Sequence, residues 1–126
     1  MSGTALLYQP GAKEPEITAL TAPPQLEYLQ AAVGGFIEMA PGFNSIEHAG
    51  AVVPCVVFAN EEGKLQRLEV NVPATMLWDL ALRRLVDDDG KPLYRNGLLM
   101  PNGNPSDVLC GPILVLIGEP AFLDAL

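Results

Sequence analysis

The sequence predicts an α+β fold, a mixed, mostly antiparallel sheet of about five to six strands with two helices packed on it. Short apolar and β-branched runs alternate with turns rich in glycine and proline, which is typical of strands. Two other segments have the period of a helix and begin beside prolines. The chain has 126 residues, 49% of them apolar, so residues 1–126 suit a single domain that buries its core without disulfides or a metal.

A strand pair is expected near the start of the chain. The run from Ala5 to Gln9 has the apolar character of a strand and stops at Pro10-Gly11, a turn signal. Glu16 to Leu20 is the next run of strand length, and we expect it to pair with the first.

The first helix is expected to begin at Pro23 and Pro24, because proline fits the first helical turn, where its missing N–H has no partner. Gly34-Gly35 supplies the left-handed residue that ends many helices. Phe36 to Ala40 then returns as a strand. The expected buried face of the helix has the spacing i, i+3, i+7: Leu26, Leu29 and Val33.

The middle of the chain predicts a loop followed by a hairpin. Residues 41–50 have no clear period and are expected to form the loop. Val52 to Asn60 is β-branched and aromatic and predicts one strand, with Pro54 at an edge or bulge because proline cannot donate a ladder hydrogen bond. The polar stretch ending at Lys64 suits a hairpin turn, which predicts Leu65 to Val70 as the partner strand.

The second helix has the clearest signals. Asn71 can cap it, Pro73 fits its first turn, and its body runs from Ala74 to Val86. Polar residues recur every four positions: Thr75, Asp79 and Arg83. Apolar residues occupy the remaining circumference: Met76, Leu77, Trp78, Leu80, Ala81, Leu82 and Leu85. This wide apolar arc predicts a helix that is sandwiched inside the domain or meets a second subunit through Trp78 and Leu82.

A long irregular connection and a central strand are expected to close the domain. Residues 87–106 are rich in Asp, Gly, Pro and Asn, and loops of this length often carry function. The expected apolar anchors of the loop are Tyr94, Leu98, Leu99 and Met100. Val108 to Gly118 predicts the central strand, and residues 119–126 predict a short tail. The tail's apolar Ala121, Phe122 and Leu123 suit packing on a neighbour, so a homo-oligomer is expected.

The charge of the chain limits its partners. A formal net charge of −8 argues against DNA or RNA binding, which normally needs a basic face. Acidity fits either simple solubility or a surface that imitates DNA phosphates, and composition does not separate the two.

The cysteines and the hydropathy pattern predict a cytoplasmic protein. Cys55 and Cys110 lie in apolar runs, which favours buried free thiols. Residues 1–4 lack the basic residues and apolar stretch of a signal peptide, so a cytoplasmic location is expected, that of the host if a phage encodes the chain. The longest nearly apolar run, Val108 to Gly118, is well short of the roughly 20 residues that span a bilayer, so no membrane segment is expected.

No catalytic or metal-binding motif is found in the sequence. His48 is the only histidine, and with the two cysteines it lacks zinc-ligand spacing. No serine or cysteine lies in a nucleophile motif, and the run Asp87 to Gly90 lacks the spaced ligands of an EF-hand. We therefore expect a non-enzymatic protein without a cofactor or metal.

Candidate ligand-binding residues gather near the second helix. The helix start at Asn71 and Thr75 offers N–H donors for a phosphate, and Tyr94 or Trp78 can stack on a base. Three arginines offer positive charge: Arg83, Arg84 and Arg95. These residues predict a site for a small, nucleotide-like ligand. A purely structural interpretation makes Asn71 a cap and Arg83 the i, i+4 partner of Asp79.

Four segments together resemble a small family of phage- and plasmid-encoded proteins of unknown function. They are residues 33–38 (Val-Gly-Gly-Phe-Ile-Glu), residues 60–65 (Asn-Glu-Glu-Gly-Lys-Leu), residues 71–75 (Asn-Val-Pro-Ala-Thr) and residues 111–115 (Gly-Pro-Ile-Leu-Val). The resemblance spans about Tyr8 to Gly118 and brings no catalytic residues. It implies a mobile-element accessory protein that blunts host defence.

Such a protein is expected to sequester a small signal that is derived from a nucleotide. The alternative is an acidic DNA mimic, or another protein-binding inhibitor, that blocks a host defence or restriction protein. A hydrolase of defence signals is a third possibility, but the chain lacks nucleophile and metal motifs.

Overall fold

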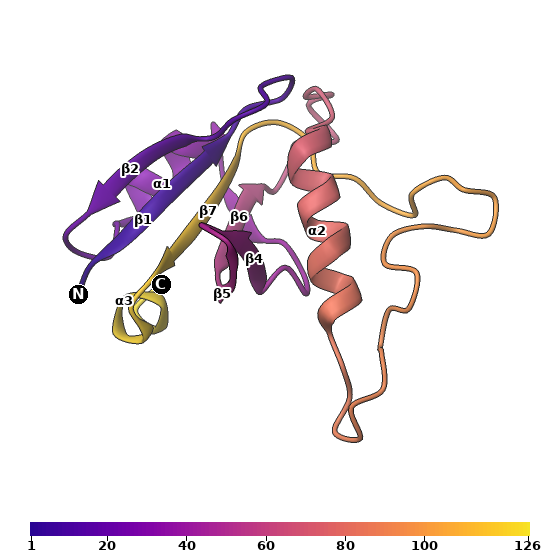
Figure 1. Cartoon of the computed structure of the whole chain (residues 1–126). Helices are drawn as coiled ribbons and strands as arrows, with labels where there is room; N and C mark the ends of the chain where they lie inside the picture. The colour runs from indigo at the N-terminus through magenta and orange to yellow at the C-terminus, as the bar shows by residue number, and fades with distance from the viewer.

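The computed structural model describes residues 1–126 and contains seven strands and three helices (Figure 1). The strands are β1 (Gly3–Tyr8), β2 (Glu16–Leu20), β3 (Ile37–Met39), β4 (Ser45–His48), β5 (Ala51–Pro54), β6 (Val56–Asn60) and β7 (Ile113–Gly118). The helices are α1 (Leu26–Val33), α2 (Val72–Arg84) and α3 (Pro120–Asp124). Five strands form one sheet in the order β2-β1-β7-β6-β3, and β4 and β5 form a separate hairpin. The α+β class is confirmed, and every strand pair is antiparallel.

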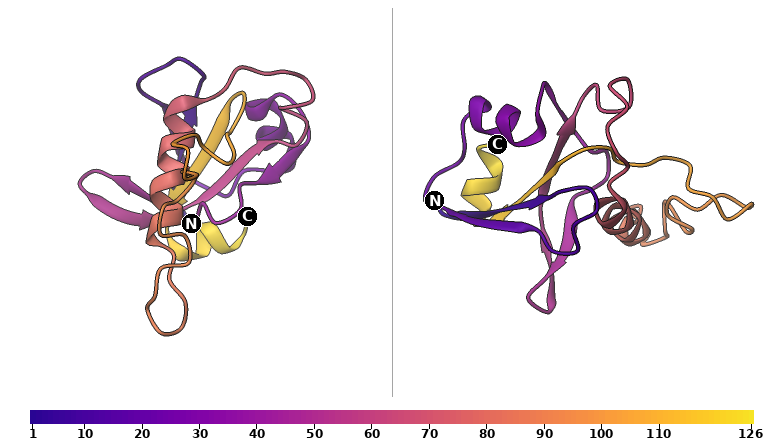
Figure 2. Two further views of the ribbon diagram at one scale, coloured as in Figure 1. Left: turned by 90° about the vertical axis from the view of Figure 1, so that its right-hand side faces the viewer. Right: turned by 90° about the horizontal axis from the view of Figure 1, so that it is seen from above.

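Strand β7 lies at the centre of the sheet and is buried on both faces. Side chains alternate along a strand, so its residues divide between two apolar clusters. Ile113, Val115 and Ile117 belong to the cluster that contains α2, whereas Leu114 and Leu116 belong to the cluster that contains α1 and α3. Figure 2 shows α1 and α3 on one side of the sheet and α2 on the other. Coverage of both faces explains why the strand is an unbroken apolar run.

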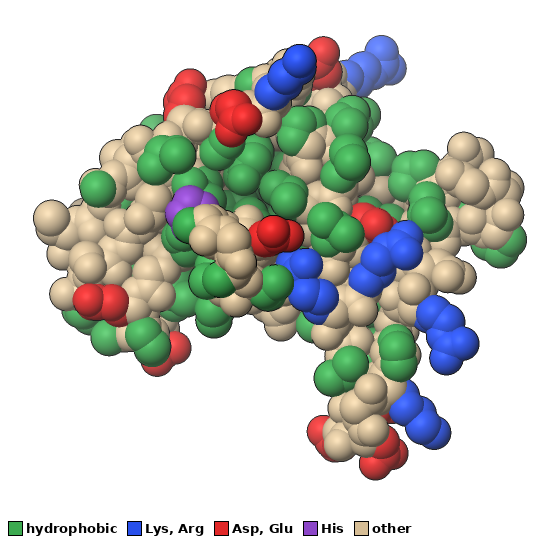
Figure 3. Space-filling model, viewed as in Figure 1, with side chains coloured by type: hydrophobic (Ala, Val, Ile, Leu, Met, Phe, Trp, Pro, Cys, Tyr) green, Lys and Arg blue, Asp and Glu red, His purple; other side chains and the backbone are tan.

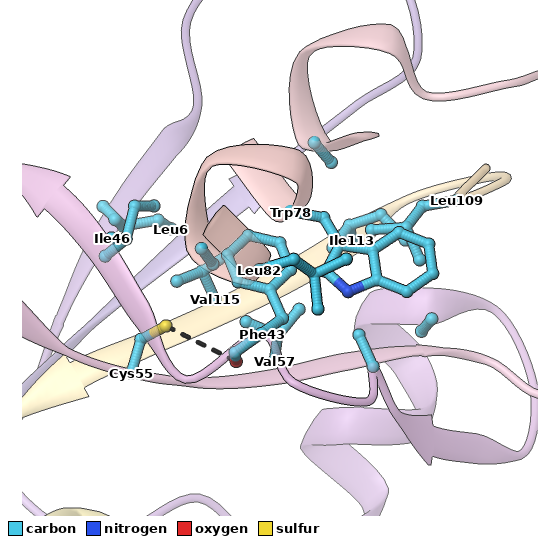
Figure 4. Packing of buried hydrophobic residues seen from close by; sticks show 14 of the residues in the cluster. Leu6, Phe43, Ile46, Cys55, Val57, Trp78, Leu82, Leu109, Ile113 and Val115 are labelled. Carbon is cyan, nitrogen blue, oxygen red and sulfur yellow. Dashed lines mark hydrogen bonds between the residues drawn. The ribbon is translucent and has the colours of Figure 1, made fainter. Parts of the chain in front are cut away.

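The larger cluster joins α2 to the sheet and to the β4–β5 hairpin (Figure 4). Trp78 and Leu82 of α2 are 4% and 5% exposed and pack in this cluster with Ile46 of β4 and Val57 of β6. These two α2 side chains, predicted to meet a second subunit, are therefore core residues of one subunit. The helix is not sandwiched, because the sheet covers only one of its faces.

The segment from 41 to 60 corrects two predictions. The expected loop contains β4, and the expected single strand is broken at Cys55 into β5 and β6. Pro54 lies in the two-stranded sheet, where every strand is an edge, as predicted. The Cys55 N–H bonds to the Asn44 carbonyl and its thiol donates to the Phe43 carbonyl at 3.7 Å, so the chain bends there from the hairpin into the main sheet.

The predicted hairpin partner from Leu65 to Val70 is wrong. Residues 61–67 form successive turns, and Val70 makes only an isolated bridge with Cys110. The Asn60 side chain starts the turns, because its Oδ1 accepts the Glu62 N–H at 2.8 Å. Both edges of β6 are occupied by β3 and β7, which leaves no edge for the returning chain.

The helix ends follow their local signals to within a few residues. Helix α1 begins at Leu26 rather than at the prolines, and Leu26 is exposed although Leu29 is buried. The predicted glycine stop is confirmed, because Gly34 has φ 79° and its N–H bonds to the Gln30 carbonyl. Helix α2 has the predicted cap but ends at Arg84, before Val86.

Strand β7 and the loop before it also differ in detail from the prediction. The strand starts at Ile113 instead of Val108, so the irregular connection is longer than expected. Of the four predicted anchors in that connection, only Leu98 is buried. No helix of the chain is both long enough and apolar enough to cross a membrane.

The predicted tail forms helix α3, which packs on its own subunit. Phe122 is fully buried in the cluster with α1, so it is not available to a neighbour. A side chain at Gly3 would approach the Phe122 ring to 2.4 Å, which shows how closely α3 fits against the start of β1.

Replacing Phe122 tests this arrangement. We expect Phe122→Ala to lower the free energy of unfolding by about 3–5 kcal/mol, because it removes a large buried ring. Urea unfolding followed by tryptophan fluorescence measures the loss. The matched control is Asp124→Ala, which changes an exposed residue of the same helix. Equal stabilities of the two variants would show that α3 does not contribute to the core.

Candidate functional site

Asn71 is a fully buried anchor at the start of α2. Its Nδ2 donates to the carbonyls of Tyr8 at 2.8 Å and Gly111 at 2.9 Å. Its Oδ1 accepts the Ala74 N–H at 3.1 Å. Both amide hydrogens and the oxygen thus have protein partners, and the side chain joins three segments of the chain instead of facing a ligand.

The start of α2 has few donors left for an anion. Pro73 has no N–H, the Ala74 N–H bonds to the cap, and the Thr75 N–H bonds to the Asn71 carbonyl at 2.9 Å. The predicted phosphate site requires several free N–H groups at this end. The geometry therefore supports the structural interpretation of Asn71 as a cap.

The polar stripe of α2 holds the long connection between α2 and β7. The Thr75 hydroxyl accepts the Leu109 N–H at 3.0 Å, and Asp79 Oδ1 accepts the Leu98 N–H at 2.7 Å. A side chain at Gly97 would meet Asp79 Oδ1 at 2.1 Å, so glycine allows the loop to approach this closely. Two successive turns of the helix thus fix two separate points of the loop.

The third turn adds an ion pair to this stripe. Arg83 Nε donates to Asp79 Oδ2 at 2.9 Å, and its terminal nitrogen donates to the Asn96 carbonyl at 3.0 Å. We call Thr75, Asp79 and Arg83 the loop-binding stripe. It supplies partners to loop backbone groups that have no strand or helix to bond with.

A groove lies between α2 and the loop. It has a volume of about 400 Å³, and its lining is mostly apolar: Val70, Val72, Thr75, Met76, Asp79, Leu80, Leu98, Leu99, Pro105 and Val108. The α2 members follow the spacing of one helical face. Hydrophobic side chains gather over α2 and beside the loop in Figure 3. This groove is the candidate functional site, because concave apolar surfaces with few polar groups are typical of ligand sites.

The polar atoms of the groove restrict what it can bind. The Thr75 hydroxyl accepts one hydrogen bond and retains its own hydrogen, and the Asp79 carboxylate has free lone pairs beyond the two bonds that it accepts. No basic residue lines the groove. The groove therefore suits an apolar or flat group that carries N–H donors. The Asp79 carboxylate would repel a phosphate.

A family model described as a domain of unknown function (DUF3846) matches residues 1–122. The chain belongs to the DUF3846 family. No curated protein and no solved structure matches it. Membership of the DUF3846 family brings no assigned activity.

The structure does not bring the six predicted site residues together. Thr75 lines the groove and Arg83 holds the loop beside it, whereas Arg84 binds Ser45 of β4 through its Nε at 2.8 Å. Tyr94 borders a separate depression that includes Trp78, and Arg95 is exposed. Asn71 is buried, as described above.

The sequence prediction did not separate the α2 wall of the groove, formed by Val72, Met76 and Leu80, from the core face of the helix. The predicted apolar arc of the helix places Met76 and Leu80 with the core residues of α2, and Val72 precedes the predicted helix body. Their spacing of i, i+4, i+8 was the available signal, since it runs beside the polar stripe and separates them from Trp78 and Leu82.

A second, smaller cavity lies under the turns after β6. It measures about 280 Å³ and is bordered by Trp78, Cys110 and the ion pair between Lys64 and Asp107, among others. No group of three or more His, Cys, Asp or Glu residues is placed to hold a metal ion. The cavity shares only Val108 with the lining of the groove.

The loop-binding stripe can be tested at Asp79. We expect Asp79→Ala to release the loop, because the Leu98 N–H and Arg83 lose their acceptor, with a loss of about 1–3 kcal/mol in the free energy of unfolding. Hydrogen exchange of the Leu98 amide should accelerate while β7 stays protected. Asp88→Ala, in the exposed turn beyond α2, is the control. An unchanged Leu98 exchange rate in Asp79→Ala would contradict the role of the stripe.

The two thiols should differ in reactivity. Burial raises the pKa of the Cys55 thiol to about 12 against the opposing effect of Arg84. At pH 8 we expect iodoacetamide to modify the half-buried Cys110 first and to leave Cys55 protonated and unmodified. Peptide mass spectrometry over time measures both sites. Modification of Cys55 at the rate of Cys110 would show that the hairpin does not bury it.

Proposed function

We propose that this DUF3846 chain is a non-catalytic protein that binds and sequesters a small ligand in the groove between α2 and the loop. The apolar groove of about 400 Å³ carries the proposal. That volume lies within the range of roughly 300–1,000 Å³ of small-molecule sites. The loop-binding stripe fixes the far wall, so the groove does not have to form anew when a ligand arrives.

The hydrogen bonds of the polar groups in the groove support a binding role and not a catalytic one. Thr75 and Asp79 are the hydroxyl and carboxylate of the groove, and both accept backbone N–H groups of the loop. Groups that hold the structure in this way orient a ligand through their remaining lone pairs and hydrogens.

The ligand best suited to the groove has a flat apolar face and N–H donors at its edge, as a nucleobase has. In a nucleotide-derived signal, the base would enter the groove and the phosphates would stay outside, away from the Asp79 carboxylate. The resemblance to phage and plasmid proteins supports a setting in which removal of such a signal blunts host defence.

Calorimetry with matched nucleosides and nucleotides tests the ligand class. We expect nucleosides to bind more tightly than their mono-, di- and triphosphates, since each phosphate adds negative charge to the ligand and the groove has a carboxylate but no basic residue. Leu80→Asn should weaken binding roughly tenfold, because it places a polar group in the apolar wall. Met39→Asn is the control, since Met39 is similarly exposed but lies on β3.

Mass spectrometry of ligands released from the protein, purified from cells with an active nucleotide-signalling defence, identifies the natural ligand. An unmodified released molecule supports sequestration. Affinity that rises with each phosphate and is unchanged in Leu80→Asn would overturn the proposed site.

A second candidate function is inhibition of a basic, DNA-handling protein by imitation of DNA. The distribution of charge favours it. Residues 71–106 contain four acidic and four basic residues, so the net charge of −8 belongs to the rest of the chain, which has eleven acidic and three basic residues. A basic partner would therefore bind away from the groove, and duplex DNA should compete with this chain for that partner.

A further inference from the structure

Helix α2 has a third surface that neither the core nor the loop covers. Val72, Met76 and Leu80 are 57%, 63% and 47% exposed and form a continuous row along the helix. Val70 and Leu99 line the same groove and extend the apolar region with exposures of 42% and 49%. Single exposed apolar residues are ordinary, but a continuous patch of this kind marks an interaction surface.

The charges around this patch favour a second copy of the chain. Asp79 is the only charged residue that lines the groove beside the row, and it is paired with Arg83. Residues 71–106 as a whole are also neutral, since four acidic residues are balanced by four basic ones. Two copies that meet here bury a neutral surface and keep their acidic surfaces apart, which limits the repulsion between chains of charge −8. A strongly basic partner would be attracted to the acidic remainder of the chain instead.

The row is also symmetric about its central residue. In a row with spacing i, i+4, i+8, a two-fold axis at Met76 brings Val72 opposite Leu80 of the partner subunit. Rows of this spacing interdigitate when two helices cross at about 50°, with axes about 8–10 Å apart. A two-fold interface uses the same surface on both subunits, and the equal spacing of the row allows it to meet its own copy in this register.

We infer that a second copy of the chain covers this row, so that two α2 helices cross at Met76. Helix α2 thus contributes to the core, holds the loop and pairs with its copy through three different stripes. The pairing stands on exposure, charge and symmetry, and it does not rest on the proposed function.

Sedimentation velocity at several concentrations tests the pairing. The wild-type chain is expected to form a dimer at micromolar concentration. Met76→Glu should weaken the dimer at least a hundredfold, because it places two carboxylates at the two-fold axis. Met39→Glu, an equally exposed methionine on β3, should leave the dimer intact. Circular dichroism spectra that match that of the wild type show that both variants are folded.

Disulfide trapping gives the geometry. In a Cys110→Ser background, Met76→Cys should form a disulfide-linked dimer on oxidation and Met39→Cys should not. A wild-type monomer at about 100 µM would overturn the inference and leave the patch to a different protein. A dimer that survives Met76→Glu would equally overturn it. Calorimetry on the same samples separates the proposals, because a monomer that binds ligand contradicts only the pairing.

Discussion

The buried amide of Asn71 is the constraint on which the rest of the structure depends. It joins the end of β1, the segment before β7 and the first turn of α2 through three hydrogen bonds of 2.8–3.1 Å. Tyr8 and Gly111 come from distant parts of the chain, so this single side chain sets the position of α2 against the sheet. An amide is required here, because loss of it would leave the buried Gly111 carbonyl and the half-buried Tyr8 carbonyl without this donor, at about 1–3 kcal/mol for a buried group. Once α2 is placed, Trp78 enters the core and the loop-binding stripe faces the loop.

The candidate site follows from the way α2 distributes its side chains. One face packs on the sheet, the loop-binding stripe supplies hydrogen-bond partners to an irregular backbone, and a third row stays exposed. The loop itself has no helix or strand, only turns and two isolated bridges, between Val86 and Pro92 and between Leu99 and Pro105. Side chains of a rigid helix therefore determine where the loop lies, which is the usual relation between a scaffold and a functional loop. The ligand proposal and the pairing proposal both depend on this single arrangement.

The charge distribution gives the molecule two surfaces that suit different kinds of partner. The neutral, apolar surface of α2 and its loop suits an uncharged ligand or a second copy, whereas the acidic remainder suits a basic partner. Membership of the DUF3846 family covers nearly the whole chain, so the α+β architecture belongs with the family domain and not with an added segment. What the chain binds depends on the groove and on the acidic surface.

The sequence by itself determined the features that local chemistry encodes. The cap at Asn71, the glycine stop at Gly34, the pairing of β1 with β2 and the irregular loop were all predicted, as was the ion pair of Asp79 with Arg83, because each depends on neighbouring residues. Tertiary structure decided the rest: the break at Cys55, the lack of a strand after β6, the burial of Phe122, and the separation of the α2 row into core and groove residues. These features depend on which segments cover each face of the sheet. They also depend on which backbone groups lack a partner in segments that are distant in the sequence. A periodic pattern shows that a residue prefers burial or a hydrogen bond. Only the folded chain supplies the surface that buries it or the atom that bonds to it.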